Sequence, residues 1–437
     1  MIMNIQIPRT NQKRIVIIGG GFGGLTLADK LKKQNFQIVL IDRNNYHQFQ
    51  PLLYQVASSG LESSSISFPY RKQFRKRKNF FFRLAEVHAV NTEKNEVETS
   101  IGNLIYDYLV IAAGSTTNFH GNDIIRQWSF PMKSVEEALT LRNYLLLNLE
   151  WALDCDNDKT RQKLLNVVIV GGGATGVEIA GAISEMKRYI IPNDYPDLKG
   201  VDEINIYLIE RSDRILSAFS KESSDHALRF LKKMGVTVIL NKTVTGFENN
   251  YVLLDDGQRI GTNSLIWVSG VKAEHIDRIN TESIGRGGRI LVNKFNQVSG
   301  YTNVFAIGDI CLQPEKNYPN GHPQLAPVAI QQGKHLARNF KRQLKKKEWK
   351  PFLYTDKGTL ATIGRNKAVA EIRNIKLYGF PAWVVWLLVH LRSILGVKNK
   401  VLVLLDWMWN YITYDQSVRF ILFVKPRKRM KMDDKLK

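Results

Sequence analysis

The feature that most constrains this chain is a glycine-rich turn that occurs twice, each time between a short apolar run and a helical pattern. The first turn reads GGGFGG and follows RIVII, and the second reads GGGATG and follows NVVIV. In the pattern G-x-G-x-x-G, the first glycine makes a tight turn, the second lets the backbone approach a pyrophosphate, and the third permits close packing of helix on strand. The sequence therefore predicts two βαβ units that each bind a nucleotide.

Each unit then continues to a second strand that ends in an acid, Asp42 after FQIVLI and Glu210 after INIYLI. A carboxylate in this position accepts hydrogen bonds from a ribose. Because it also repels a ribose 2′-phosphate, Glu210 favours NADH over NADPH. The six glycines that fit the pattern are Gly19, Gly21, Gly24, Gly171, Gly173 and Gly176.

Two dinucleotides in one chain indicate two redox carriers, and the simplest pair is a bound flavin and a diffusible nicotinamide. The strand signal TNVFAIGD ends in Asp309, an acid placed to hold the ribityl or pyrophosphate part of an extended FAD. The alternative is that Asp309 only caps a helix after the strand. Gly114, at the end of YDYLVIAAG, completes the candidate FAD contacts.

Composition excludes several other classes. The chain has 437 residues, and its 44% hydrophobic and 23% charged residues are typical of two or three globular domains. Its two cysteines, Cys155 and Cys311, form no closely spaced pair, which disfavours a disulfide framework, a thiol relay and a cysteine-rich metal site. We expect no metal. The first residues lack the apolar core of a signal peptide. We therefore expect that the main part of the protein is not exported and lies on the reducing, cytosolic side of the membrane.

The net charge of +22 predicts an anionic partner, which is either nucleic acid or the acidic surface of a lipid bilayer. Basic runs such as RKQFRKRK and KRQLKKKEWK are typical of solvated helix faces, and no nucleic-acid-binding fold is recognisable. We therefore expect the membrane surface and no nucleic acid.

With these pieces placed, nearly the whole chain resembles the type II NADH dehydrogenases, single-subunit flavoenzymes that pass electrons from NADH to a membrane quinone without pumping protons. The resemblance is carried by IVIIGGGFGG, YHQFQPLLYQVASSGL, GGGATGVEIA, TNVFAIGD and the C-terminal HLRSILGVKNKVLVLLDWMWNYIT. It implies FAD on the first glycine unit and on Asp309, NADH on the second unit, and a quinone that approaches the flavin from the membrane side.

The same resemblance implies the catalytic residues. Glu178 matches an acid that lies near the nicotinamide and the flavin, with roles in NADH placement and in proton delivery to the quinone; an exposed helix acid is the alternative. The family's quinone-facing segment reads Ala-Gln-x-x-x-Gln, whereas this chain has LAPVAIQQGK. Pro327 thus replaces the first glutamine, Gln331 matches the second and Gln332 follows it. Lys400 matches a position close to the quinone, although a solvated or lipid-facing lysine is an equal alternative.

The C-terminal module is rich in tryptophan and leucine. Its longest apolar stretch, AWVVWLLV, is far shorter than the roughly 20 residues that span a bilayer, so we expect an interfacial helix that begins near Pro381. Basic residues flank the apolar segments and continue in a tail from Lys425. The alternative is that the aromatic residues pack on the reductase core or form a dimer interface. The predicted interfacial residues are Trp383, Val384, Trp386, Leu387, Leu391, Ile394, Leu395, Trp407, Trp409, Tyr411 and Tyr414.

The predicted fold is α/β, with two Rossmann-like dinucleotide-binding domains and a C-terminal amphipathic helical module that anchors the protein to a membrane. The NADH domain, residues 156–294, is expected to be inserted in a discontinuous FAD domain, residues 1–155 and 295–375. The second FAD segment carries the quinone-facing residues, and residues 376–437 form the C-terminal module.

The expected function is FAD-dependent electron transfer from NADH to menaquinone or ubiquinone in a respiratory chain, by a homodimer on the cytoplasmic face of the membrane. Sulfide:quinone oxidoreductase is one alternative, since it shares the fold, but it needs cysteines that flank the flavin. A redox-sensing or scaffold flavoprotein that binds NADH without turnover is the other.

Overall fold

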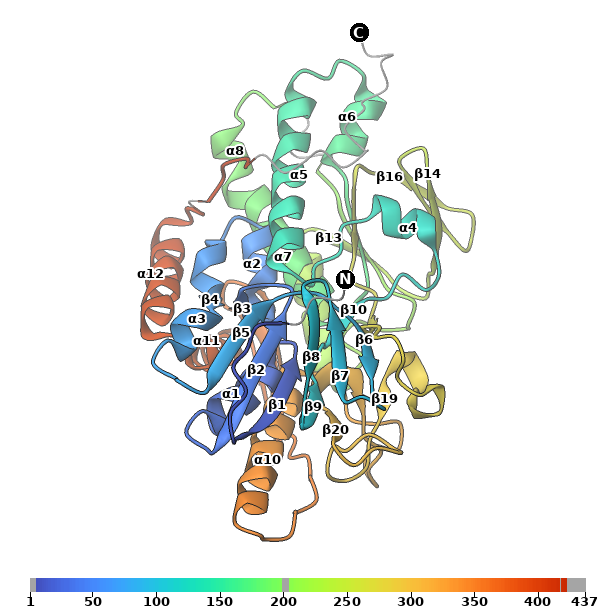
Figure 1. Ribbon diagram of the computed structural model, residues 1–437. Coiled ribbons are helices and arrows are strands. Elements are labelled where there is room, and N and C mark those ends of the chain that lie inside the picture. Colours follow the sequence, from blue (N-terminus) through green and yellow to red (C-terminus); the bar gives the residue numbers. More distant parts are fainter. Residues whose placement is uncertain (1–4, 199–203, 417, 423–437) are drawn as a thin grey trace. The chain divides into compact units, whose positions relative to one another are not determined.

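The computed structural model describes residues 5–198, 204–416 and 418–422 (Figure 1). The chain divides by its internal contacts into two compact units, and neither unit is continuous in sequence. Unit 1 comprises residues 1–48, 67–116 and 271–357, and unit 2 comprises residues 49–66, 117–270 and 358–437. Each glycine-rich turn therefore belongs to a different unit.

This division by contacts differs from the boundaries at 155, 294 and 375. The difference arises because residues 49–66, 117–155 and 358–416 pack with the second glycine-rich unit and residues 271–294 with the first, whereas the sequence boundaries follow the order of the motifs. The sequence boundaries remain a prediction about the functional domains.

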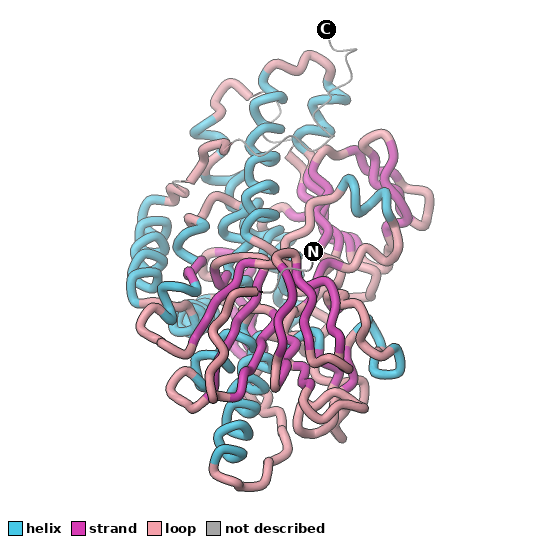
Figure 2. Tube along the Cα trace, viewed as in Figure 1, coloured by secondary structure: helices cyan, strands magenta, loops and turns pink. Residues whose placement is uncertain are grey.

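Unit 1 is built on a five-stranded parallel sheet in the order β20-β9-β1-β2-β5, visible as neighbouring magenta strands in Figure 2. The central strands carry buried apolar runs, residues 15–18 in β1 and 38–41 in β2, as is usual for parallel sheets whose two faces are covered. Gly23 and Gly333 let helices α1 and α10 cross closely, since a Cβ on Gly333 would lie 2.5 Å from the Gly23 carbonyl oxygen. The helices and strands of unit 1 are β1 (Lys13–Ile18), α1 (Phe22–Leu31), β2 (Phe36–Asp42), β3 (Tyr46–Gln48), β4 (Ser67–Pro69), α3 (Tyr70–Phe74), β5 (Phe80–Leu84), β6 (Val87–Asn91), β7 (Glu96–Thr99), β8 (Gly102–Ile105), β9 (Tyr108–Ile111), β18 (Val271–Ala273), β19 (Ile290–Leu291), β20 (Val304–Ala306), β21 (Cys311–Leu312) and α10 (Ala326–Leu344).

Unit 2 contains a four-stranded parallel sheet in the order β13-β12-β11-β17 and two antiparallel sheets, β14-β15-β16 and β22-β23-β24. Its helix α5 begins with a capping box between Ser134 and Glu137. The helices and strands of unit 2 are α2 (Leu53–Ala57), α4 (Asp123–Trp128), α5 (Val135–Leu153), α6 (Asp158–Leu165), β11 (Val167–Val170), α7 (Ala174–Tyr189), α8 (Ile191–Asp194), β12 (Ile206–Ile209), α9 (Lys221–Lys233), β13 (Val236–Ile239), β14 (Val244–Glu248), β15 (Tyr251–Leu254), β16 (Arg259–Gly261), β17 (Ser264–Trp267), β22 (Thr359–Gly364), β23 (Lys367–Ile372), β24 (Ile375–Tyr378), α11 (Phe380–Ser393) and α12 (Val397–Thr413). The parallel sheets confirm the predicted α/β class with Rossmann-type units.

Candidate functional site

The first glycine turn joins β1 to α1 with the geometry that the pattern predicts. Gly19 has φ = +94°, which L side chains rarely adopt, and a Cβ on Gly24 would lie 2.0 Å from the Gly19 carbonyl oxygen. A Cβ on Gly21, by contrast, meets no protein atom within 4 Å. The turn is therefore closed on the protein side and open at Gly21, where a pyrophosphate needs to approach the backbone.

Asp42, the last residue of β2, holds this turn directly. Its Oδ2 accepts a hydrogen bond from the Gly20 N–H at 2.6 Å, and its Oδ1 accepts one from the Asn44 N–H at 2.7 Å. Burial raises the pKa of Asp42, against the lowering effect of these N–H donors and of the Tyr70 hydroxyl. The sequence analysis missed Gly20, although the run of three glycines was the available signal.

Asp309 and Gly114 come together in unit 1 because their strands, β20 and β9, are neighbours in the sheet. Asp309 lies in a short 3₁₀ helix after β20, and its Oδ2 accepts a hydrogen bond from Ser115 Oγ at 2.6 Å. Gly114, with φ = +78°, immediately precedes Ser115. Both residues thus lie at the carboxyl ends of parallel strands, the edge at which α/β sheets bind ligands. Their contact with FAD remains a prediction.

The quinone candidates on α10 differ in what their side chains do. Gln332 is buried, and its Oε1 accepts a hydrogen bond from the Gly308 N–H at 2.7 Å, so it supports the turn before Asp309. Gln331 exchanges two hydrogen bonds with the backbone of Thr355, at 2.9 and 3.1 Å. Pro327 lies in the first turn of α10, where a proline costs no helical hydrogen bond.

The second glycine turn repeats the first in unit 2. Gly171 has φ = +116°, a Cβ on Gly176 would lie 1.8 Å from the Gly171 carbonyl oxygen, and a Cβ on Gly173 would meet no protein atom within 4 Å. Glu210 follows β12 and accepts hydrogen bonds from the Gly172 N–H at 2.5 Å and the Ser212 N–H at 2.8 Å. The sequence analysis also missed Gly172, because the pattern G-x-G-x-x-G leaves the second position of the turn free, as it does at Gly20.

Glu178, in the second turn of α7, is the most strongly perturbed of the predicted residues. Its side chain is buried, with 9% of the residue exposed, so it is not the exposed helix acid of the alternative. Burial raises its pKa to about 8, although the Thr362 N–H and the nearby Trp386 indole both oppose this rise. Among the residues that the structure describes, the indole N–H has no hydrogen-bond partner of ordinary geometry. Glu178 is therefore poised to bind and release a proton near neutral pH.

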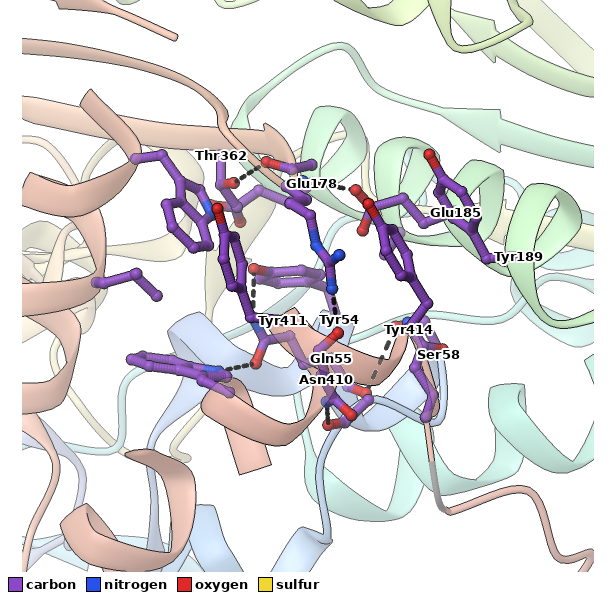
Figure 3. A pocket seen from close by; sticks show the side chains of 18 of the residues that line it. Tyr54, Gln55, Ser58, Glu178, Glu185, Tyr189, Thr362, Asn410, Tyr411 and Tyr414 are labelled. Carbon is purple, nitrogen blue, oxygen red and sulfur yellow. Dashed lines mark hydrogen bonds between the residues drawn. The ribbon is translucent and has the colours of Figure 1, made fainter. Parts of the chain in front are cut away.

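A cavity of about 120 Å³ lies against Glu178 within unit 2 (Figure 3). Its walls come from α2, α7, β22, α11 and α12, together with the segment after α12. The sequence analysis named some of these residues but did not foresee that they enclose one space. The lining residues are Tyr54, Gln55, Ser58, Gly60, Glu178, Ala182, Glu185, Tyr189, Ile190, Thr362, Gly364, Arg365, Trp383, Trp386, Leu387, Trp407, Asn410, Tyr411, Tyr414 and Gln416.

Two of the predicted interfacial residues, Trp386 and Ile394, are buried in the protein, whereas the other five from Trp383 to Leu395 are only partly buried. Trp386 is 1% exposed, Ile394 is buried, and Trp383 and Leu387 line the cavity. Trp407 on α12 donates its indole N–H to Gln55 Oε1 at 2.8 Å. Trp386 and Trp407 therefore pack on the reductase core, which is compatible with an interfacial role for other residues of the module.

Exposed apolar residues occur on α11, at Phe380, Leu388 and Val389, and are more numerous on α12. Lys400 on this helix donates a hydrogen bond to the Arg392 carbonyl oxygen at 2.8 Å and does not line the cavity. Within the described ranges, no helix combines the length and apolar character needed to cross a membrane. The basic tail from Lys425 lies outside the described residues. The exposed apolar residues of α12 are Val397, Val401, Leu404, Leu405, Met408, Trp409, Tyr411 and Ile412.

Known proteins match both parts of this architecture. The family model of pyridine nucleotide-disulphide oxidoreductases matches residues 13–333, and that of the NDH2 C-terminal domain matches residues 357–413. The type II NADH:quinone oxidoreductase Ndh of Mycobacterium tuberculosis is 34% identical over 423 residues, which cover 93% of this chain and 89% of that protein.

Two solved structures show the likeness of fold. NDH2 from Plasmodium falciparum, solved with NADH, has a TM-score of 0.87 at 21% identity and covers 94% of this chain and 100% of its own. The sulfide:quinone oxidoreductase of Aquifex aeolicus has a TM-score of 0.71 at 19% identity. The match covers 92% of this chain and 95% of that structure's chain. At these identities the likeness establishes the fold alone.

Proposed function

This chain belongs to the type II NADH:quinone oxidoreductases, and we propose on that basis that it carries electrons from NADH through a bound FAD to a membrane quinone in a respiratory chain. The observation that carries the proposal is the pair of glycine turns, each closed by a strand-terminal acid, in a chain that also matches the NDH2 C-terminal domain. When bound, FAD accepts a hydride from NADH and passes two electrons to the quinone.

The residues of unit 1 fit FAD. The open backbone at Gly21 suits the pyrophosphate, and the Asp42 carboxylate at the end of β2 suits the adenosine ribose. Asp309, positioned by Ser115 beside Gly114, suits the ribityl or pyrophosphate part of the extended cofactor. These residues bind and orient the cofactor.

The residues of unit 2 fit NADH in the same way. The open backbone at Gly173 suits the NADH pyrophosphate, and Glu210 suits the ribose 2′-hydroxyl. Because the Glu210 carboxylate is fixed by two N–H donors, it cannot move away from a 2′-phosphate without releasing the turn. This supports selectivity for NADH over NADPH.

For the quinone half-reaction, we assign proton delivery to Glu178. Reduction of a quinone by NADH consumes one proton besides the transferred hydride, and a carboxyl group with a pKa of about 8 is protonated at neutral pH and can release that proton. The candidates for contact with the quinone remain Pro327, Gln331, Gln332 and Lys400.

Sulfide:quinone oxidoreductase is less well supported. Cys311 is buried, and burial raises the pKa of its thiol to about 12, so it is a poor source of the thiolate that sulfide chemistry requires. Cys155 is the other free cysteine and lies in a different unit.

We further propose that the protein binds an anionic membrane surface from the cytoplasmic side, as a homodimer, without spanning the bilayer. Residues 397, 401, 404, 405, 408 and 412 follow helical spacing and give α12 one exposed apolar face. Val397 is 79% exposed and Ile412 is 75% exposed, and Lys398 lies beside the face. Such a face combined with nearby cations is typical of interfacial helices.

A comparison of electron donors tests the proposed function. We expect the purified protein, supplied with lipid vesicles and a quinone, to oxidise NADH steadily and to show no quinone reduction with sulfide. Turnover with sulfide in place of NADH would favour the sulfide enzyme. Binding of NADH without any quinone reduction would favour a redox-sensing protein.

A further inference from the structure

Helix α7 carries a second carboxylate on the same face as Glu178. Glu185 lies seven residues further on, which is about 10 Å along the helix axis and almost in line, because 3.6 residues make a turn. Between the two acids this face bears only Gly181 and Ala182. A Cβ on Gly181 would lie 1.7 Å from the Ile363 carbonyl oxygen, so the glycine lets α7 press against β22. Both carboxylates line the cavity (Figure 3).

Glu185 is held by a backbone N–H group. Its Oε1 accepts a hydrogen bond from the Arg365 N–H at 2.5 Å, and a Cβ on Gly364 would lie 2.7 Å from the same oxygen. In the described part of the chain, no lysine or arginine forms an ion pair with it. Burial raises its pKa, and the charges of Lys367 and Arg365 oppose this rise only in part.

The Arg365 guanidinium is engaged elsewhere. It lies over the Tyr414 ring at 3.6 Å and over the Tyr411 ring at 4.8 Å, and it donates a hydrogen bond to the Asn410 carbonyl oxygen. These contacts keep the cation away from the carboxylate, which is then able to take up a proton. Tyr411 and Tyr414 are 41% and 43% exposed, so this end of the cavity reaches the surface.

Tyr54 on α2 lines the same cavity as the two acids. Burial raises the pKa of its hydroxyl, and the charges of Glu178 and Glu185 act in the same direction. Gln55 Nε2 donates a hydrogen bond to the Tyr54 hydroxyl oxygen at 2.8 Å, and Gln55 Oε1 accepts one from Trp407, so the orientation of this amide is fixed. The hydroxyl proton therefore points to another acceptor. The cavity has room for several water molecules, each of which occupies about 30 Å³ in the liquid.

The geometry points to a proton path in which Glu185 takes protons from solvent and passes them, through water in the cavity and the Tyr54 hydroxyl, to Glu178. Glu185 is the outer acid because part of its surface stays exposed, whereas Glu178 is buried. Per turnover, NADH gives up a hydride, which supplies two electrons and one proton, a second proton travels along the path, and the quinone becomes a quinol. This path rests on the proposed role of Glu178.

The test measures reoxidation of the NADH-reduced holoenzyme by a quinone, which needs protons, and by ferricyanide, which needs none. For Glu185→Gln we expect the ratio of the two rates to fall at least tenfold. Glu185→Asp keeps a titratable group and should retain much of the wild-type ratio of quinone rate to ferricyanide rate. Formate added to Glu185→Gln should restore much of this ratio. Glu248→Gln, which replaces an exposed carboxylate of unit 2, is the control and keeps the wild-type ratio.

Parallel measurements on Glu178→Gln separate the two proposals. If the ratio falls in Glu178→Gln but not in Glu185→Gln, the proton role of Glu178 stands and the path is wrong. If it falls in neither variant, both are wrong. An equal loss with both acceptors in Glu185→Gln, with no rescue by formate, shows a structural role and also overturns the path.

Discussion

The buried carboxyl group of Glu178 makes the stability of the protein depend on pH in a direction opposite to that of a salt-bridged acid. In the unfolded chain this group ionises above its ordinary pKa of 4.5, but in the folded protein it keeps its proton up to about pH 8. Between these values the folded state binds more protons than the unfolded state, so stability falls as pH rises and levels off above pH 8. Glu178→Gln removes this dependence.

The magnitude follows from the two pKa values. At about 1.4 kcal/mol for each pH unit, burial of the ionisable group costs about 1 kcal/mol at pH 5, about 3 kcal/mol at pH 7 and about 5 kcal/mol at pH 9. A glutamine keeps an amide oxygen that can accept the Thr362 N–H and cannot ionise. The stability gained by Glu178→Gln relative to wild type should therefore grow by about 4 kcal/mol between pH 5 and pH 9.

Paired unfolding of the wild-type and Glu178→Gln holoenzymes, at one heating rate and several pH values, measures this difference. The infrared band of the protonated Glu178 carboxyl group is identified by its absence in Glu178→Gln. In the wild-type protein this band should disappear as the pH is raised, with a midpoint near pH 8. Glu93→Gln, at an exposed position in unit 1, is the matched control. A stability difference that stays constant with pH, or one that shrinks as pH rises, would refute the reasoning.

Three further predictions test other parts of the site. NADH should be preferred over NADPH by at least about tenfold, or about 1.4 kcal/mol, and Glu210→Ala should narrow this ratio of kcat/KM; equal values in the wild type would contradict the role of Glu210. Gly24→Ala should yield protein without bound FAD because its Cβ would lie 2.0 Å from a carbonyl oxygen, whereas Gly21→Ala should fold normally and bind FAD more weakly, as flavin content after purification would show. Leu405→Glu together with Ile412→Glu, on the exposed face of α12, should release the protein from anionic vesicles in sedimentation, and unchanged sedimentation would indicate a dimer interface there.

Such point substitutions test membrane binding more cleanly than removal of the whole C-terminal module would. Truncation would remove Trp386, which is 1% exposed, and Trp407, which is bonded to Gln55. Loss of these side chains would disturb the cavity as well as the surface. Point changes at exposed positions separate the two effects.

The nucleotide turns were predictable because every determinant is local. The glycines, the apolar runs and the strand-terminal acids Asp42 and Glu210 lie within single βαβ units, and each conformational requirement is met by a residue type. The N–H donors at Gly20 and Gly172 were missed because the general pattern leaves that position free.

The cavity was not predictable because its walls meet only in the fold. Tyr54, Glu185, Arg365 and Trp407 lie on elements that are far apart in sequence, and nothing local marks them as neighbours. Hydrophobic spacing identified α11 as amphipathic, but it does not reveal what the apolar face contacts. Trp386 therefore packs inside unit 2, whereas the exposed apolar face belongs to α12.

The central claim is that electrons pass from NADH through a bound flavin to a quinone, and anaerobic double mixing tests it most directly. NADH added to the purified protein should bleach the visible flavin spectrum, and a menaquinone or ubiquinone analogue added next should restore it, with two electrons transferred for each flavin. The rates with the two analogues would rank the acceptors. A protein without a flavin spectrum, or one whose spectrum NADH bleaches but no quinone restores, would contradict the account.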